Sequence, residues 1–235
     1  MTTSYATAQR IGTRSHQCDA TATATDGGNR AFVLLDGIGS TAKVRAWTRD
    51  KARLLARIAA QTGSPAAALA AVRAVVDHEG PEQRHDPDSD DEPSAVAVVA
   101  VWLPGGVLRV AWTGDARAYW NGKPLTVDHN WAEIARAEGR KAPWWYRNLV
   151  ASHLGRHPDD GTHGPLGEAE PVKGPGRLVL LSDGVYSPFE DHGWDLTGAL
   201  RDGQPRETAA RLVNRAVRSP DPRHDNATAL VADLG

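Results

Sequence analysis

Aspartates placed beside apolar segments are the residues of this sequence best suited to chemistry. Asp36, Asp115 and Asp183 each follow an apolar run typical of a buried strand, and Asp225 directly precedes another such run. Aspartate is unfavourable within a strand, so a strand end places its carboxylate on the rim of a sheet. If these rims converge, the carboxylates share one small volume and repel one another, and a divalent cation removes that penalty.

Carboxylate oxygens indicate which cation such a site would hold. With few nitrogen or sulfur donors beside them, they favour Mg²⁺ or Mn²⁺ over zinc. Two such ions about 4 Å apart could hold a bridging hydroxide and clamp a phosphoryl group for in-line attack. Gly37, directly after Asp36, would let a backbone carbonyl approach a metal closely. A single Asp-Gly pair is most often only a turn, so this hypothesis depends on the repetition.

The elements that must position these aspartates are short strands joined by turns, with fewer helices. Asn121-Gly122 predicts a hairpin turn, and Ser64 followed by Pro65 predicts the start of a helix. Tight turns between consecutive strands, including Gly114-Asp115, imply antiparallel pairing. The prediction is an α+β fold with helices packed on a two-sheet core. The expected strands are residues 31–35, 95–103, 107–112, 116–120, 177–181 and 228–232, and the expected helices are 42–60, 65–77, 131–138 and 207–217.

Composition limits the class of protein. A length of 235 residues suits one domain, and we predict a single catalytic domain over residues 1–235, with an acidic loop at about 79–93 and a lid or insertion at about 141–172. The net charge of −2 predicts no nucleic-acid partner. Cys18 is the only cysteine, which excludes an intramolecular disulfide and argues against a cysteine-based zinc site. The longest apolar run, residues 95–103, is too short to cross a bilayer, so we expect a cytoplasmic protein with no membrane partner.

Six short motifs occur in a fixed order along the chain. They are Arg14-x-x-x-x-Asp19, Asp36-Gly37-Ile38-Gly39, Thr113-Gly114-Asp115-Ala116-Arg117, Asp128-His129, Ser182-Asp183-Gly184 and Asp225-Asn226-Ala227-Thr228.

Their order and spacing resemble the metal-dependent (type 2C, PPM) serine/threonine protein phosphatases, in the form of a bacterial-type minimal catalytic domain. The resemblance runs from about residue 14 to residue 232. It implies a four-layer α-β-β-α sandwich of two antiparallel sheets flanked by helices. It also implies hydrolysis of phosphoserine and phosphothreonine by water bridging two Mg²⁺ or Mn²⁺ ions. The partner would be a phosphorylated protein, with the enzyme opposing a serine/threonine kinase as a monomer or weak oligomer.

The resemblance also assigns metal ligands. Asp36 would bridge both ions and the Gly37 carbonyl would bind one of them. Asp183 and Asp225 would bind the other ion. Asp19 would hold metal-bound water. Asp36, Asp183 and Asp225 would thus form the catalytic set.

Two further roles follow, and the departures from the family pattern bear on one of them. Arg14 would grip the substrate phosphate, a contact that a planar guanidinium makes well. Asp115 matches the residue used for a weaker third metal. The family's usual residues are replaced by Cys18, Ala116 and Ser187 at three positions around the site, which weakens the case for that third ion. The same replacements motivate an alternative function, a catalytically weak phosphatase-fold module that binds phosphoprotein partners.

Several other patterns suggest different sites. Gly37-x-Gly39-x-x-Ala42 has the outline of a dinucleotide-binding turn, but two helices follow it where a second strand is required. Asp86-x-Asp88-x-Asp90 lacks the glycine and glutamate of a calcium loop. His153-x-x-x-His157 has zinc-like spacing without a helix to support it.

Two residue pairs, Asp128-His129 and Trp144-Trp145, each allow two interpretations. We interpret Asp128-His129 as a structural turn before a helix rather than an acid–base pair. Trp144-Trp145 could line a substrate groove or pack a lid.

Overall fold

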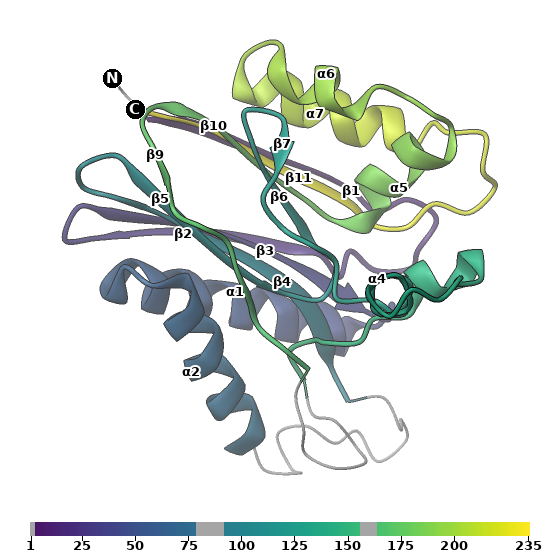
Figure 1. The fold of residues 1–235 in the computed structure, drawn as a ribbon, viewed down its shortest axis with the longest axis horizontal. Helices are drawn as coiled ribbons and strands as arrows, with labels where there is room; N and C mark the ends of the chain where they lie inside the picture. The colour runs from purple at the N-terminus through teal and green to yellow at the C-terminus, as the bar shows by residue number, and fades with distance from the viewer. Residues whose placement is uncertain (1–2, 79–91, 156–163) are drawn as a thin grey trace.

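Two antiparallel sheets stacked face to face form the centre of the molecule, with helices on both outer faces (Figure 1). The structure is a computed structural model, and it describes residues 3–78, 92–155 and 164–235. The sequence predicted this arrangement of two sheets between helical layers, and it is confirmed.

The first sheet carries the longest strands. Its central strand β3 pairs on both sides, Phe32 lying opposite Ala100 on β4 and Thr23 on β2. In order, the sheet contains β2 (Ala20–Asp26), β3 (Asn29–Ile38), β4 (Ser94–Leu103), β5 (Val107–Thr113) and β8 (Gly167–Glu168), while β9 (Val172–Lys173) also pairs with β5.

The second sheet joins the two ends of the described chain. Its strand β11 lies between β1 and β10, so the last strand of the chain holds the first. In order, the sheet contains β1 (Ser4–Arg10), β11 (Ala227–Leu234), β10 (Gly176–Leu181), β6 (Arg117–Trp120) and β7 (Lys123–Pro124). The β6–β7 hairpin turns at Asn121-Gly122, where both residues have positive φ, as the sequence predicted.

Each outer face is covered by its own set of helices. On the six-stranded sheet lie α1 (Ala42–Thr62) and α2 (Pro65–His78), and Ser64 caps α2 through a 3.2 Å bond from the Ala67 amide. On the five-stranded sheet lie α5 (Asp183–Asp191), α6 (Leu196–Arg201) and α7 (Pro205–Ala216). The short helix α4 (Trp131–Ala137) and the 3₁₀ helix η1 (Trp144–Asn148) sit together at one end of the sandwich (Figure 1).

The main core lies between the sheets. Alternate residues of β3 face opposite ways, so Phe32 and Leu34 enter this inter-sheet core, while Val33 and Leu35 pack against α1 and α2. Burial on both faces explains why the strand sequence is apolar without interruption. Leu178 and Leu180 of β10 enter the same inter-sheet core from the other side.

Three expectations about the elements need correction. The sequence suggested that β3 stops before Asp36, but the strand continues through Asp36 and Gly37 to Ile38. The Gly114-Asp115 turn was expected to pair β5 with β6, but it carries the chain from one sheet to the other. Strands β1 and β2 and helices α5 and α6 were not predicted.

The remaining segments bear on the predicted loop and insertion. The acidic loop at 79–93 falls almost entirely outside the described residues. The described part of 141–172 contains η1, β8 and the first residue of β9. None of the helices in the described part of the chain has the length and apolar character needed to span a membrane.

Candidate metal centre

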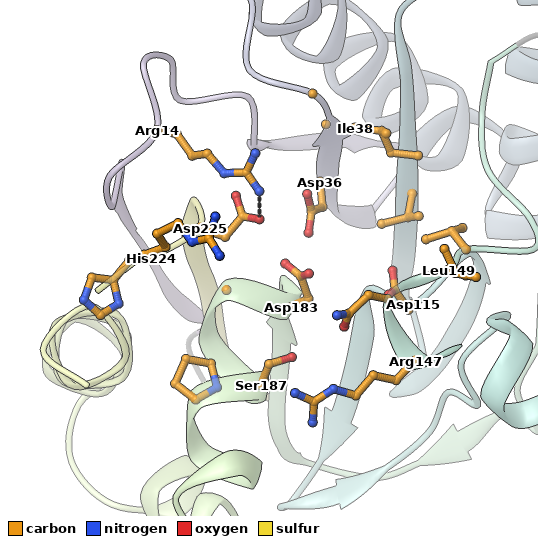
Figure 2. Close-up of a pocket in the computed structure, with 18 of the residues that line it drawn as sticks. Arg14, Asp36, Ile38, Asp115, Arg147, Leu149, Asp183, Ser187, His224 and Asp225 are labelled. Atoms are coloured by element: carbon orange, nitrogen blue, oxygen red, sulfur yellow. Dashed lines mark hydrogen bonds and ion pairs between the residues drawn. The ribbon is translucent and has the colours of Figure 1, made fainter. Parts of the chain in front are cut away.

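Four of the predicted aspartates line one pocket of about 990 Å³ at the end of the sandwich. Asp36 and Asp183 point toward each other across it, with Asp225 and Arg14 on one flank and Asp115 on the other (Figure 2). The residues come from both sheets, so only the assembled sandwich brings them together.

The strand pattern explains how two of these carboxylates reach the pocket. Asp36 continues the alternation of Phe32 and Leu34, so its side chain lies on the inter-sheet face of β3, one step beyond the apolar core. Asp183 begins α5 directly after β10, with Ser182 at the N-cap.

Asp115 and Asp225 occupy connections rather than strands. Asp115 lies in the turn that crosses from β5 to β6 between the sheets. Asp225 lies just before β11, and its Oδ1 accepts a 2.7 Å bond from the amide of Asn226. The Asn226 side chain then ties this segment to the N-terminal region, accepting from the Cys18 amide at 2.7 Å and donating to the Ile11 carbonyl at 2.8 Å.

Asp19 lies beneath the pocket instead of on its wall. It is buried, and its Oδ2 accepts a 3.0 Å bond from Ser182 Oγ. Its Oδ1 is buried without a hydrogen-bond partner among the described residues. A buried carboxylate oxygen without a donor is costly, and a bound cation or a water attached to one would satisfy it.

The electrostatics of the cluster favour protonated carboxyl groups when no cation is present. Burial, followed by the neighbouring charges of Asp19 and Asp183, raises the pKa of Asp36 well above its usual range. Burial raises the pKa of Asp19 and of Asp115 to about 8 in each case, and in both the charge of Asp183 adds to the effect. Burial and the charge of Asp225 raise the pKa of Asp183. Each acid is therefore destabilised in its ionised form by its surroundings.

Arg14 supplies the positive charge nearest this cluster. Its Nη2 lies 2.5 Å from Asp225 Oδ2, and both side chains are partly exposed. The loop that carries it is fastened to the segment before Asp225, because the Thr13 amide donates to the His224 carbonyl at 2.9 Å and the His224 amide donates to Thr13 Oγ1 at 3.1 Å. Arg14 thus stands at the pocket edge with an anionic oxygen as its partner.

Gly37 meets a steric requirement at the pocket wall. A Cβ atom at this position would lie 2.6 Å from the Cys18 carbonyl oxygen and 2.9 Å from Val44 Cγ1. Glycine therefore lets β3 pass between the Cys18 segment and α1. Sequence reasoning attributed this glycine only to access for a metal, so it missed the packing reason.

Asp115 is held in place by a group of residues that the sequence did not reveal. Arg117 binds Asp128 with two bonds of 2.9 and 2.8 Å and lies 3.7 Å from the ring centre of Tyr186. The Tyr186 hydroxyl donates to the Asp115 carbonyl at 3.0 Å. Asp128 is therefore a structural partner of Arg117, and it lies two residues before Asn130, which caps α4.

Arg147 is a second pocket residue that the sequence missed. It comes from η1 and binds Asp191 of α5 with bonds of 2.5 and 2.8 Å. In the sequence, the only feature that pointed to Arg147 was its position inside the segment predicted as a lid or insertion. The exposed side chains of Trp144 and Trp145, which were given a groove or packing role, do not line the pocket among the described residues.

The donor set fits a hard divalent cation in its chemistry, because carboxylates and an unsatisfied carboxylate oxygen gather at one place. As the side chains stand, no group of three or more His, Cys, Asp or Glu residues in the described part of the chain is close enough to coordinate one ion. In this arrangement Asp225 is paired with Arg14.

Comparison with solved structures decides the fold. The chain is similar to a serine/threonine phosphatase from S. agalactiae, with a TM-score of 0.80, 16% identity and full coverage of both chains. It is also similar to the PPM Ser-Thr phosphatase MsPP from Mycobacterium smegmatis (TM-score 0.74, 24% identity, 99% of this chain and 98% of that one). The chain has the fold of the PPM phosphatases. A third structure with this PPM fold, the catalytic domain of PstP in complex with two manganese ions, matches with a TM-score of 0.69 and 24% identity over 99% and 98% of the two chains.

Sequence-level comparison adds no further assignment beyond the PPM fold. No protein-family model matches the chain, and no curated protein matches it. At the identities found, the structural likeness establishes the fold, and the roles of individual residues depend on the site itself.

The structure bears on the three alternative sites that the sequence suggested. β3 and β4 are antiparallel neighbours, so Gly37-x-Gly39-x-x-Ala42 does not open the parallel βαβ unit that a dinucleotide turn requires. The acidic triplet at 86–90 lies outside the described residues. His153 lines the carboxylate pocket, while His157 lies outside the described residues.

Proposed function

We propose that this chain is a metal-dependent phosphoprotein phosphatase that hydrolyses phosphoserine and phosphothreonine esters. The observation that carries the proposal is the convergence of Asp36, Asp183 and Asp225 in one pocket, with the Arg14 guanidinium at its edge. A phosphate ester needs both kinds of group, because carboxylates hold the cations that activate water and a guanidinium binds phosphate oxygens.

The proposed ligands follow the assignment made from the sequence. Asp36 would bridge two cations, Mg²⁺ or Mn²⁺, the Gly37 carbonyl would bind one, and Asp183 and Asp225 would bind the other. Two such cations, when bound, activate water at neutral pH and neutralise charge on the phosphoryl group. Their presence would also remove the repulsion that, together with burial, raises the pKa values of Asp36 and Asp183.

Arg14 would orient the substrate. Its guanidinium already pairs with one carboxylate at the pocket edge, and a phosphate dianion offers the same anionic oxygens in a geometry that suits two parallel bonds. A phosphoryl group held there would face Asp36 and Asp183 from the open side of the pocket.

Asp19 and Asp115 would serve the same centre less directly. Asp19 has one oxygen without a donor below the pocket, which suits a contact to cation-bound water. Asp115 reaches the pocket from the crossing turn and would contribute to a third, weaker site. The Tyr186 hydroxyl supports its backbone carbonyl, whereas Ala116 offers no side-chain oxygen.

The comparisons support this function at the level of the fold. The similar structures are serine/threonine phosphatases, and one of them is a complex with two manganese ions. A cytoplasmic site of action, a phosphoprotein partner phosphorylated by a serine/threonine kinase, and a monomeric or weakly associated state belong to the proposal too.

Hydrolysis of p-nitrophenyl phosphate and of a phosphothreonine peptide tests the proposal. We expect no turnover after treatment with a chelator and recovery with Mn²⁺ or Mg²⁺. A folded, metal-loaded protein that turns over neither substrate would contradict it. If that protein still bound the phosphopeptide, the alternative of a phosphoprotein-binding module would take its place.

A further inference from the structure

A second hollow lies on the helical layer over the five-stranded sheet. It has a volume of about 520 Å³, and we call it the arginine pocket. It is lined by Trp194, which follows α5, and by residues of the second half of α7 and the turn after it. The lining residues are Trp194, Arg211, Asn214, Arg215 and Arg218.

The arginine pocket is lined by three positively charged side chains. Its three arginines are spaced four and three residues apart, so they share one face of α7 and its continuation. No carboxylate of the described residues lines the pocket, and none of the three arginines forms an ion pair with a described residue. The dipole of α7 favours cations at its C-terminal end, but it supplies no partner for their hydrogen-bond donors.

Two of the arginines are held in fixed positions by neutral groups. Arg211 Nη2 donates to the carbonyls of Ala199 and Asp202 at 2.9 and 2.8 Å. The Arg215 guanidinium lies 4.3 Å from the ring centre of Trp194, in a cation–π contact. Trp194 is itself fixed by Phe189, whose ring meets it edge-on at 5.5 Å. These contacts orient the guanidinium groups without neutralising them, so little ordering remains to be done when an anion binds.

We propose that the arginine pocket binds an acidic segment of the phosphoprotein substrate. The proposal rests on the proposed function, and it adds a determinant of substrate choice outside the catalytic pocket. Arginine forks match carboxylate geometry, and three of them in one hollow suit a run of Asp and Glu residues. A nucleic acid fits less well, because the Trp194 ring that would have to stack on a base already carries Arg215.

The position of the arginine pocket sets the spacing of the acidic residues. Helix α5 begins at Asp183 and ends at Asp191, three residues before Trp194, so Asp183 and the arginine pocket are separated by about the length of this helix. Nine helical residues span about 13 Å. An extended peptide covers about 3.3 Å per residue, so the acidic residues should lie about four to eight positions from the phosphorylated residue.

Described side chains connect the two sites. Asp221 lines the catalytic pocket, and its Oδ2 lies 3.3 Å from the Nε2 atom of His192, whose ring centre lies 5.0 Å from that of Trp194. A peptide crossing from one site to the other would therefore pass over described, structured residues.

Paired phosphopeptides test this proposal. Both carry the same phosphothreonine core, and one has a run of aspartates about six residues away where the other has asparagines. In the wild-type protein with Mn²⁺, we expect kcat/KM to be about tenfold higher for the acidic peptide, since each exposed ion pair contributes only modestly. The ratio between the two peptides should fall toward one as salt rises, because exposed charges are screened.

Substitutions of the arginines test whether the arginine pocket causes the difference in kcat/KM between the two peptides. Arg215→Gln with Arg218→Gln should reduce the ratio to near one, and Arg218→Gln alone should reduce it partly. The Arg218 side chain forms no hydrogen bond or ring contact with a described residue, so the single variant remains informative if the double variant misfolds. The matched control is Arg206→Gln, an exposed arginine at the start of the same helix and outside the arginine pocket, which should leave the ratio unchanged.

The results of these experiments distinguish failure of the arginine-pocket proposal from failure of the proposed phosphatase function. Equal kcat/KM for both peptides in the wild type, or an unchanged ratio in the double variant, would overturn the arginine pocket while leaving the phosphatase intact. If no substrate is turned over, fluorescence anisotropy with the labelled acidic peptide still measures the pocket directly. Tighter binding of oligothymidylate than of the acidic peptide, lost in the same variants, would assign the pocket to nucleic acid and overturn the proposal.

Discussion

The inter-sheet core and the carboxylate pocket are lined by the same strands but have opposite chemistry. Along β3, Phe32 and Leu34 enter a dry apolar core, and Asp36, two residues later on the same face, enters the pocket. Along β10, Leu178 and Leu180 are followed by Ser182 and Asp183. On β3, one side-chain alternation therefore serves stability along the strand and places an acid at its end, whereas Asp183 is placed by the start of α5.

This contrast shows that folding brings together carboxylates whose mutual repulsion opposes folding. The core residues gain stability from burial, whereas burial and neighbouring charges raise the pKa values of Asp19, Asp36, Asp115 and Asp183. A ligand that binds only the folded state can offset that cost. The predictions below test whether the two regions can be changed independently.

The largest expected effect is the loss of activity from the pocket. Asp36→Asn should reduce Mn²⁺-dependent hydrolysis of p-nitrophenyl phosphate on the order of 1,000-fold or more, because it removes the carboxylate proposed to bridge both cations. The metal-free variant should melt at a higher temperature than the metal-free wild type, because one of the repelling acids is gone. Steady-state kinetics and thermal melts measure the two effects.

Asp26 provides the matched control for Asp36. It also ends a strand and precedes a glycine, but it is exposed and lies outside the pocket. Asp26→Asn should change neither activity nor melting temperature appreciably. Retained hydrolysis in Asp36→Asn would refute its assignment as a ligand.

A substitution in the inter-sheet core should lower stability without changing activity. Leu180→Ala removes a fully buried side chain between the sheets and should lower the free energy of unfolding by about 2–5 kcal/mol. The kcat per folded molecule should stay close to the wild-type value. Urea denaturation measures the loss, with the exposed Val75→Ala as a control of similar chemistry. A large fall in kcat without unfolding would show that core and pocket are not separable.

Metal should stabilise the folded protein through the pocket. At a Mn²⁺ concentration of about 100 times the dissociation constant, the free energy of unfolding should rise by about 2.7 kcal/mol for one site, because the ion binds the folded state only. Thermal melts with and without a chelator give the shift. Asp183→Ala should lose most of it, and an equal shift in that variant would place the metal elsewhere.

The metal-free protein should become less stable as pH rises. Asp19 and Asp115 have folded-state pKa values of about 8, above those of unfolded aspartate. Between about pH 4 and pH 8 the folded state therefore binds more protons than the unfolded state, and stability falls as pH rises through this window. Each proton retained only by the folded state costs about 1.4 kcal/mol per pH unit, so we expect a loss of several kcal/mol between pH 5 and pH 8 in urea titrations. Asp115→Asn should flatten the profile, and a metal-free wild type that grows more stable over this range would contradict the electrostatic account.

The sequence revealed those parts of the fold whose signals are local. Strands β3, β4 and β10 are apolar on both faces, and α1 carries a clear apolar stripe, so each was predicted within a few residues of its bounds. Strands β1 and β2 were missed because their alternation is of Ala with Thr and Gln, with few large apolar side chains. Helix α5 was missed because it begins on Asp-Gly, which resembles a turn, and contains Pro188.

The site residues likewise divide into those with a local sequence signal and those without one. Aspartates beside strands could be found from their neighbours along the chain, and the structure brings them into one pocket. The pairs of Arg117 with Asp128 and of Arg147 with Asp191 join residues 11 and 44 positions apart with no local pattern relating them, so only the folded chain reveals them. The Gly114-Asp115 turn was assigned to a hairpin because sheet membership is set by distant pairing partners, which the turn itself does not encode.

The smallest change we expect comes from the edge of the pocket. Arg14→Ala should raise the KM for p-nitrophenyl phosphate about tenfold while leaving Mn²⁺ affinity within about twofold of the wild-type value, because Arg14 is proposed to bind phosphate and not metal. Since Arg14 now pairs with Asp225, its removal also frees that carboxylate, so any change in Mn²⁺ affinity should be toward tighter binding. Kinetics and calorimetric titration separate the two parameters, and Arg10→Ala, at the exposed end of β1, is the matched control. Weaker Mn²⁺ binding with an unchanged KM would mean that Arg14 supports the ligands, and the phosphate would then have to be held elsewhere in the pocket.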